Sequence, residues 1–139
     1  MKFRLAFVGF GKVAQGLTEL LVRKHDQLKR DYGFDYRIVA VADTVKGSVM
    51  NKRGLDAERL LSLARTEGSV RAYPRGSKGL SSIETIKKAD ANVLVETTWT
   101  NLTDGEPGLT HIKTALTEGL HVVTTNKGPF ALAYHELVA

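Results

Sequence analysis

The sequence contains no cysteine, and proline and tryptophan are scarce. Without cysteine the chain can form no disulfide, no thiolate metal site and no cysteine nucleophile. Its four histidines lack the i, i+4 or clustered spacing that metal sites use, so we expect no bound metal. Only three prolines stand against 13 glycines, which favours tight turns over extended linkers. Any chemistry must come from other side chains and from the backbone.

Long hydrophobic runs and blocks of one charge are also absent. No stretch of about 18 apolar residues could cross a bilayer, and the N-terminus has no signal-peptide core, so we expect a cytoplasmic protein without a membrane partner. Twenty Lys and Arg are mixed with fifteen Asp and Glu along the chain, for a net charge of +5. This mixture argues against nucleic acid as a partner and suits a phosphate-bearing small molecule.

At 139 residues, with 42% hydrophobic and 25% charged residues, the chain is long enough for one folded domain. It is too short for a cofactor domain together with a separate substrate domain. We therefore expect residues 1–139 to form a single domain.

The N-terminal third has the pattern of a strand, a helix and a second strand. An apolar run at residues 3–9 meets a glycine and predicts a buried parallel strand. One stripe at helical spacing predicts a single helix of about five turns, which residues 31–33 end: Val13, Leu17, Leu20, Leu21, Lys24 and Leu28. Residues 36–42 are apolar and β-branched and predict a strand that stops at Asp43. Such βαβ units are almost always right-handed.

The alternation of strands and helices continues to the end of the sequence, although residues 44–79 give a weaker pattern. Asp56 is a candidate helix cap, and Ser81 with Glu84 has the form of a capping box. The further elements predicted are strands near 70–73, at 93–95 and at 121–125, and helices after 56, 81, 107 and 128. We predict an α/β fold of the Rossmann type: doubly wound, mostly parallel, with helices on both faces and lacking its last strand or strands.

Residues 9–14 read GFGKVA and match the dinucleotide fingerprint G-x-G-x-x-A at the junction of strand and helix. Gly9 permits a tight turn, Gly11 lets the backbone approach a pyrophosphate, and Ala14 allows close helix packing. The helix N-terminus offers free N–H groups and a positive dipole end to phosphates. A glycine turn without a ligand is the alternative, and the flanking βαβ pattern argues against it. The predicted cofactor-binding residues here are Gly9, Phe10, Gly11, Lys12, Val13 and Ala14.

Asp43 and Thr44 follow the second strand, where a carboxylate can accept hydrogen bonds from the ribose hydroxyls of the adenosine half. Because its charge opposes a 2′-phosphate, Asp43 favours NAD over NADP. A capping or solvated aspartate is the alternative. Four basic residues in neighbouring segments leave NADP open, namely Lys12, Lys46, Lys52 and Arg53.

Two later strands end in segments rich in hydroxyl and amide groups, residues 96–101 and 124–129. The carboxyl ends of such strands should converge on the ligand crevice of an open α/β sheet. The candidates there for the nicotinamide half are Thr97, Thr98, Thr100, Asn101 and Asn126. Trp99 either stacks near the ring or packs in a loop. Lys127 can bind a carbonyl oxygen or move a proton and is the candidate catalytic residue, unless it is a surface lysine.

Four sequence blocks in the right order resemble homoserine dehydrogenase: GFGKVAQG at 9–16, VAVAD at 39–43, TNLTDGEP at 100–107 and HVVTTNKGP at 121–129. The resemblance implies interconversion of aspartate 4-semialdehyde and homoserine with a nicotinamide cofactor, towards threonine, methionine and isoleucine. It implies that Lys127 is the active-site lysine and that Thr98, Thr100 and Asn101 lie beside the nicotinamide. The sequence departs from the family at Ala14, commonly glycine, and at Trp99, often proline.

The resemblance also implies that a substrate domain, with further catalytic groups and most of a homodimer interface, would follow Ala139. We therefore expect the 139 residues alone to bind cofactor but to be inactive. Two alternatives remain open. One is another Rossmann amino-acid dehydrogenase, such as an aspartate dehydrogenase, and the other is a module that senses NAD(H) without chemistry.

Overall fold

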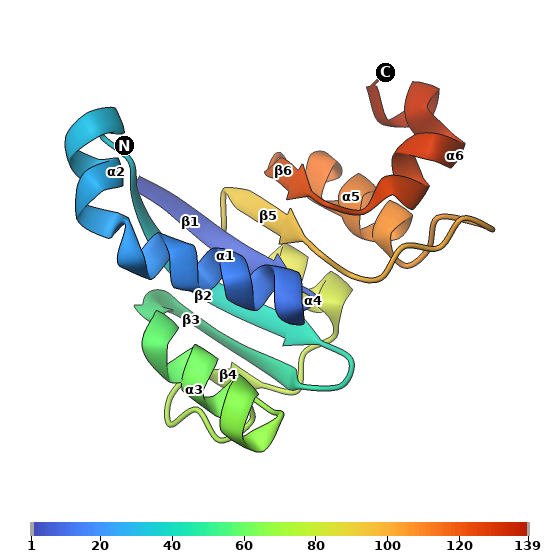
Figure 1. Cartoon of the computed structure of the whole chain (residues 1–139). Helices are drawn as coiled ribbons and strands as arrows, with labels where there is room; N and C mark the ends of the chain where they lie inside the picture. The colour runs from blue at the N-terminus through green and yellow to red at the C-terminus, as the bar shows by residue number, and fades with distance from the viewer. Residues whose placement is uncertain (1, 139) are drawn as a thin grey trace.

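The computed structural model describes residues 2–138 and contains one six-stranded sheet in the order β4-β3-β2-β1-β5-β6 (Figure 1). The strands are β1 (Lys2–Val8), β2 (Asp35–Asp43), β3 (Gly47–Leu55), β4 (Ser77–Lys78), β5 (Val93–Glu96) and β6 (His121–Thr124). The helices are α1 (Lys12–Arg23), α2 (His25–Tyr32), α3 (Ala57–Glu67), α4 (Ser82–Lys88), α5 (Gly108–Thr117) and α6 (Lys127–Val138).

Four neighbouring strands, β2, β1, β5 and β6, run parallel. In the register of the sheet, Val8 at the end of β1 lies opposite Ala42 of β2 and Glu96 of β5. Glu96 in turn lies opposite Thr124 of β6. The carboxyl ends of all four strands therefore meet at one edge, as the predicted doubly wound, mostly parallel fold requires.

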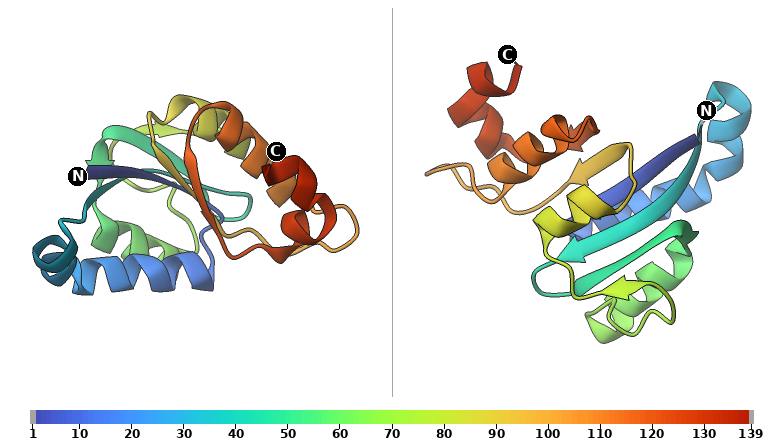
Figure 2. Two further views of the ribbon diagram at one scale, coloured as in Figure 1. Left: turned by 90° about the horizontal axis from the view of Figure 1, so that it is seen from above. Right: turned by 180° about the vertical axis from the view of Figure 1, so that it is seen from behind.

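Helices cover both faces of the sheet, with α1 and α3 on one face and α4 and α5 on the other (Figure 2). Successive residues of β1 serve both sides: Phe7 belongs to the core under α1 and α3, whereas Val8 packs with Ile86 and Ala115 under α4 and α5. Because both faces are covered, the inner strands read as continuous apolar runs.

The prediction of a single long first helix is wrong. Helix α1 ends at Arg23, Lys24 leaves the helical conformation (φ −103°, ψ 13°), and α2 begins at His25. The predicted buried stripe also shifts, because Val13 and Leu20 are exposed while Ala14 and Thr18 are buried. Ala14 packs in the core together with Leu21, whereas Val13 and Leu20 lie outside that contact.

Residues 44–79 hold two antiparallel strands, β3 and β4, that the sequence did not predict. Strand β3 pairs antiparallel with β2, and the short β4 pairs antiparallel with β3. The strand predicted near 70–73 is wrong, because these residues form a turn in which Val70 and Tyr73 are buried three positions apart. The Tyr73 hydroxyl accepts a hydrogen bond from the Asp56 N–H at 2.8 Å and ties this turn to the start of α3.

Both predicted helix caps are confirmed. Asp56 accepts hydrogen bonds from the N–H groups of the first turn of α3, and Ser81 forms a full capping box with Glu84 at α4. Helix α6 packs against α5 beside β6 and has a kink at Ala133. Among residues 2–138, no helix is both long and apolar enough to span a membrane.

Candidate functional site

The turn after β1 can only be made by glycine at its first position. Gly9 has a φ of +86°, and a Cβ atom there would lie 2.8 Å from the backbone carbonyl carbon of Thr97. The Gly9 N–H donates to the Ala42 carbonyl at 2.8 Å, and the Thr97 hydroxyl donates to the Gly9 carbonyl at 2.9 Å. The turn is therefore pressed between the ends of β2 and β5, at the centre of the carboxyl edge of the sheet.

The start of α1, directly after this turn, is open. Gly11 occupies the N-cap position, and no side chain among residues 2–138 caps the first turn. A Cβ atom on Gly11 would meet nothing within 4 Å. An uncapped helix start with free N–H groups is a ready binding site for phosphate, so the residues fit the pyrophosphate of a dinucleotide.

Both carboxylate oxygens of Asp43 accept hydrogen bonds from backbone N–H groups. One oxygen accepts from the Phe10 N–H at 2.7 Å, and the other accepts from Val45 and Lys46 N–H groups at 2.8 and 2.9 Å. Burial alone would raise the pKa of Asp43, but the hydrogen bonds from Lys46, Phe10 and Val45 outweigh it and lower the pKa below its usual value. Asp43 is thus a charged group that joins the glycine turn to the β2–β3 turn.

Two cavities adjoin Asp43. The inner one, of about 310 Å³, is lined by Gly9, Gly11, Thr97, Thr98 and Trp99 among others. The outer one, of about 560 Å³, is lined by Arg71, Lys78 and Ser81 among others. Ala42, Asp43, Thr44 and Ser82 line both. Together they offer an extended space past the open start of α1, as a dinucleotide needs.

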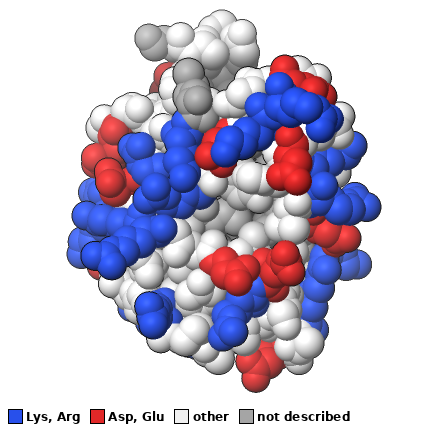
Figure 3. Space-filling model, turned by 90° about the vertical axis from the view of Figure 1, so that its left-hand side faces the viewer, with Lys and Arg blue, Asp and Glu red and all other residues white. Residues whose placement is uncertain are grey.

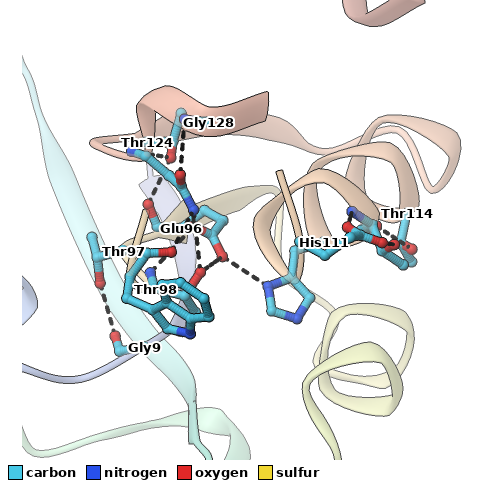
Figure 4. Close-up of polar contacts among 12 residues, drawn as sticks. Gly9, Glu96, Thr97, Thr98, His111, Thr114, Thr124 and Gly128 are labelled. Atoms are coloured by element: carbon cyan, nitrogen blue, oxygen red, sulfur yellow. Dashed lines mark hydrogen bonds and ion pairs between the residues drawn. The ribbon is translucent and has the colours of Figure 1, made fainter. Parts of the chain in front are cut away.

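A buried polar network occupies the ends of β5 and β6 (Figure 4). Its centre is Glu96, whose side chain is fully buried. One Glu96 oxygen contacts His111 Nδ1 and the Thr98 hydroxyl, both at 2.7 Å, and the other accepts from the Thr98 N–H at 3.2 Å and the Asn126 amide at 3.3 Å. The network joins β5, α5 and the turn before α6, which are distant in the sequence.

The site therefore combines an open helix start, an acid at the end of β2 and polar groups at the ends of β5 and β6. Residues 9–139 match the family model described as homoserine dehydrogenase, NAD binding domain. The chain belongs to this family. The resemblance predicted from the four sequence blocks is confirmed.

Curated relatives agree with the family. The chain is 43% identical to an NAD(+)-dependent homoserine dehydrogenase of Pseudomonas canavaninivorans over 99% of its own length. It is 39% identical to a homoserine dehydrogenase of Methanocaldococcus jannaschii over 96% of its length. The chain spans only 39% of the length of each of these relatives.

Solved structures share the fold of this homoserine dehydrogenase NAD-binding domain. A putative homoserine dehydrogenase of Archaeoglobus fulgidus aligns over 97% of this chain and 38% of its own, with a TM-score of 0.79 and 32% identity. A hyperthermophilic archaeal homoserine dehydrogenase mutant in complex with NADPH aligns over 99% of this chain and 40% of its own, with a TM-score of 0.81 and 27% identity.

The NAD-binding domain brings only part of the predicted site residues to one cavity. Those that line the inner cavity are Gly9, Gly11, Asp43, Thr44, Thr97 and Thr98. Lys12 and Val13 are exposed on the first turn of α1, and the side chains of Phe10 and Ala14 are buried in the core. Only backbone atoms of Phe10 and Ala14 are therefore available to a ligand.

The remaining candidates lie around the β6–α6 turn. Lys127 opens α6 and is exposed, and it is not among the residues that line the two cavities. Asn126 is buried and holds the turn by accepting from the Gly128 N–H at 3.2 Å. Thr100 is exposed, and Asn101 accepts from the Thr103 N–H at 2.9 Å.

The basic residues near the site differ from those expected. Lys46 lines the inner cavity, but Lys52 and Arg53 lie towards the far end of β3, where Leu55 pairs with Ile38 of β2. Arg71 and Lys78 line the outer cavity instead. Elsewhere on the surface, Lys and Arg lie interspersed with Asp and Glu on the face shown in Figure 3.

Glu96 and His111 are members of the site that the sequence did not predict. Residue 96 opens the polar segment 96–101 but is not among its candidate binding groups, and His111 is one of four histidines whose spacing is not that of a metal site. A carboxylate at the end of a strand whose other residues are apolar was the available signal, because such a group is buried and must find donors. The position of His111 on α5 gave no comparable signal.

Proposed function

We propose that residues 1–139 form the cofactor-binding domain of a homoserine dehydrogenase and bind NAD(H) or NADP(H) at the carboxyl edge of the sheet. One observation carries the proposal: the uncapped start of α1 opens beside two adjoining cavities that share Asp43. A helix start of this kind attracts the pyrophosphate, and the two adjoining cavities provide room for the two nucleosides.

In this proposal the backbone of residues 9–14 holds the pyrophosphate, with Gly11 allowing the close approach. The side chains of Lys12 and Val13 border this site on the first turn of α1. Asp43 and Thr44 lie at the ribose of the adenosine half, which occupies the outer cavity. Thr97 and Thr98 border the nicotinamide half in the inner cavity, with Thr100, Asn101 and Asn126 in the loops next to it.

The proposal favours NAD(H) over NADP(H). Asp43 is negatively charged at neutral pH, and its backbone hydrogen bonds lower its pKa further, so its charge opposes a 2′-phosphate. Arg71 and Lys78 in the outer cavity act in the opposite direction. The relatives include both an enzyme named as NAD(+)-dependent and one solved with NADPH.

The nicotinamide, when bound, supplies or accepts the hydride. The substrate pair we propose is aspartate 4-semialdehyde and homoserine, in the pathway to threonine, methionine and isoleucine. Lys127 is the proposed catalytic residue, and its ammonium group holds or protonates the oxygen that develops negative charge at the aldehyde carbon. Lys127 is the first residue of α6 and follows Asn126, whose side chain is hydrogen-bonded to Glu96, so the backbone of Lys127 is held in position.

Hydride transfer needs a closed, water-poor site around the substrate. Trp99, which lines the inner cavity, is 66% exposed, so the cavity is not closed off from solvent at this residue. We propose that the other wall is formed by a segment equivalent to the part of the relatives that this chain does not span. The same segment carries most of a homodimer interface. The 139 residues alone therefore have no activity.

The test is a pair of measurements. NADH and NADPH are titrated against the 139-residue chain by fluorescence, and oxidation of homoserine and of aspartate is assayed with the intact protein that contains it. We expect binding of NADH to the chain, and turnover of homoserine only in the intact protein. Absence of binding to either form of the protein would contradict the cofactor function. Turnover of aspartate instead would assign a different amino-acid dehydrogenase.

A further inference from the structure

His111 and Glu96 form a buried pair beside the cofactor cavity, and the proposed function gives neither a role. The His111 side chain is 7% exposed and the Glu96 side chain 0% exposed. His111 reaches the site from α5 and lines the inner cavity together with Gly9, Gly11 and Thr98. A histidine that is oriented by a buried carboxylate and that still borders a ligand cavity is placed to contact the ligand.

The contacts of Glu96 determine which nitrogen of His111 carries the proton. The Thr98 N–H and the Asn126 amide both donate to one Glu96 oxygen, at 3.2 and 3.3 Å. The other oxygen contacts the Thr98 hydroxyl and His111 Nδ1, both at 2.7 Å. Because the carboxylate accepts, Nδ1 must be the protonated nitrogen of the neutral ring.

The opposite nitrogen, Nε2, is then free to accept a hydrogen bond. It has no hydrogen-bond partner among residues 2–138, and it is not one of the fully buried side-chain atoms without a partner. Figure 4 shows the ring with Nδ1 directed at Glu96 and its other nitrogen turned away from the network. The ring therefore offers a fixed acceptor at the inner cavity.

The neighbours of His111 in that cavity indicate which part of a dinucleotide would meet it. Gly9 and Gly11 belong to the pyrophosphate turn, whereas Thr98, Trp99 and Pro107 lie beyond it at the end of β5 and the start of α5. The group between the pyrophosphate and the nicotinamide ring is a ribose, whose hydroxyls are hydrogen-bond donors.

Resting on the proposed cofactor function, we propose that His111 is a further cofactor-binding residue, whose Nε2 accepts a hydrogen bond from a hydroxyl of the nicotinamide-side ribose. Glu96 is the positioning residue that fixes the orientation and the tautomer of His111. Since Glu96 also holds Asn126, the same carboxylate sets the turn that precedes Lys127.

The variant Glu96→Gln tests the role of the carboxylate. Its amide oxygen must stay where two N–H groups, from Thr98 and Asn126, require an acceptor. Its NH₂ group then faces His111 Nδ1, which must give up its proton, so that Nε2 becomes the protonated nitrogen. In this variant we expect ¹⁵N NMR to show that Nδ1 of His111 is unprotonated and Nε2 protonated, the reverse of the wild type. An unchanged tautomer would overturn the assigned role of Glu96.

Binding measurements on the intact protein use a ladder of AMP, ADP, ADP-ribose and NADH, because only the last two contain the second ribose. Asparagine can place its amide nitrogen near Nδ1 of histidine but has no group at Nε2, so His111→Asn keeps the donor to Glu96 and loses the proposed acceptor. We expect this variant to bind ADP-ribose and NADH about three- to tenfold more weakly, the effect of one lost hydrogen bond. Binding of AMP and ADP stays within about twofold.

Glutamine places a polar group near Nε2, and His111→Gln should restore part of the lost affinity. The matched control is His121→Asn on β6, where the histidine is exposed, and it should leave the whole ladder unchanged. Equal affinities of His111→Asn and wild type for ADP-ribose would overturn the proposal, as would an equal loss for AMP. If the wild-type protein binds no member of the ladder, the cofactor function itself fails. Thermal unfolding of each variant confirms that it is folded.

Discussion

The glycine turn and the Glu96 network lie side by side at the carboxyl edge of the sheet, but they are built in different ways. The turn is made by backbone: Gly9 bonds through its N–H and C=O groups, and Gly11 leaves the start of α1 open. The network is made by side chains from β5, α5 and the turn before α6. The first region can hold phosphate with main-chain groups, and the second can position groups near a reacting centre.

The two regions should therefore respond differently to substitution. A backbone turn fails when a side chain is added, because the space and the φ angle are fixed. A side-chain network fails when a partner is removed, because buried donors are left without an acceptor. Binding of the phosphates should depend mainly on the first region, whereas the ribose contact of His111 and the position of the group that acts in turnover should depend on the second.

The largest effect is expected for Gly9→Ala. The added Cβ would lie 2.8 to 2.9 Å from backbone atoms of Thr97 and Thr98, at a φ of +86°. We expect a loss of about 2 to 4 kcal/mol in the free energy of unfolding, with loss of cofactor binding. Chemical denaturation measures the first and NADH fluorescence the second.

Gly68→Ala is the control for this experiment. Gly68 also has a positive φ, +65°, but a Cβ there meets nothing within 4 Å. Gly68→Ala should lower the free energy of unfolding by only about 1 kcal/mol and leave cofactor binding unchanged. Equal effects of the two substitutions would mean that conformation alone, and not the contact with β5, makes Gly9 necessary.

Lys127→Ala tests the second region. In the intact protein we expect kcat to fall about a hundredfold, because the group that holds the developing negative charge is lost. The Kd for NADH should change less than about twofold, because Lys127 does not line the cofactor cavities. Lys87→Ala on the exposed side of α4 is the control. A loss of cofactor affinity equal to the loss of turnover would place Lys127 in the binding region instead.

Gly11→Ala separates binding from folding within the first region. A Cβ atom at this position meets no protein atom within 4 Å, so the free energy of unfolding should change by less than about 1 kcal/mol. NADH affinity should nevertheless fall about tenfold, because the methyl group occupies the space through which the pyrophosphate approaches. Calorimetric titration beside a denaturation curve gives both values. Unchanged affinity would remove Gly11 from the phosphate site.

The smallest effect is expected for Asp43→Asn, which keeps one acceptor oxygen but removes the charge. The ratio of NADPH to NADH affinity should rise several-fold, because repulsion of the 2′-phosphate is lost. A ratio that does not change would show that Arg71 and Lys78 determine the choice.

The lowered pKa of Asp43 also predicts that the stability difference between the wild type and Asp43→Asn depends on pH. The pKa of Asp43 in the folded protein is lowered, so its stabilising contribution is present above the ordinary aspartate pKa and is lost as the pH falls through the folded value. Wild type should therefore be more stable than Asp43→Asn at pH 7, and the difference should shrink below about pH 4. Urea denaturation across this range measures it. A difference that stays constant with pH would show that the charge contributes nothing to folding.

Most of the fold was predictable because its signals are local. The apolar run before Gly9, the caps at Asp56 and Ser81, and the strand that ends at Glu96 each lie within a few residues. Strands β3 and β4 were not predictable, since β3 mixes polar and apolar residues and is buried only where it pairs with β2. Nor was the break at Lys24, where the apolar spacing continues from one helix into the next.

The glycine turn, its place between a strand and a helix, and the acid at the end of β2 can be read from the chain, because each depends on residues that are neighbours in the sequence, such as the glycine that a positive φ requires. The contacts of Glu96 with His111 and Asn126 arise only in the folded chain, as does the position of Arg71 and Lys78, rather than Lys52 and Arg53, near Asp43. These pairings join residues on different strands and helices. Their geometry follows from the parallel register that brings Val8, Ala42, Glu96 and Thr124 to one edge, and no local pattern in the chain contains it.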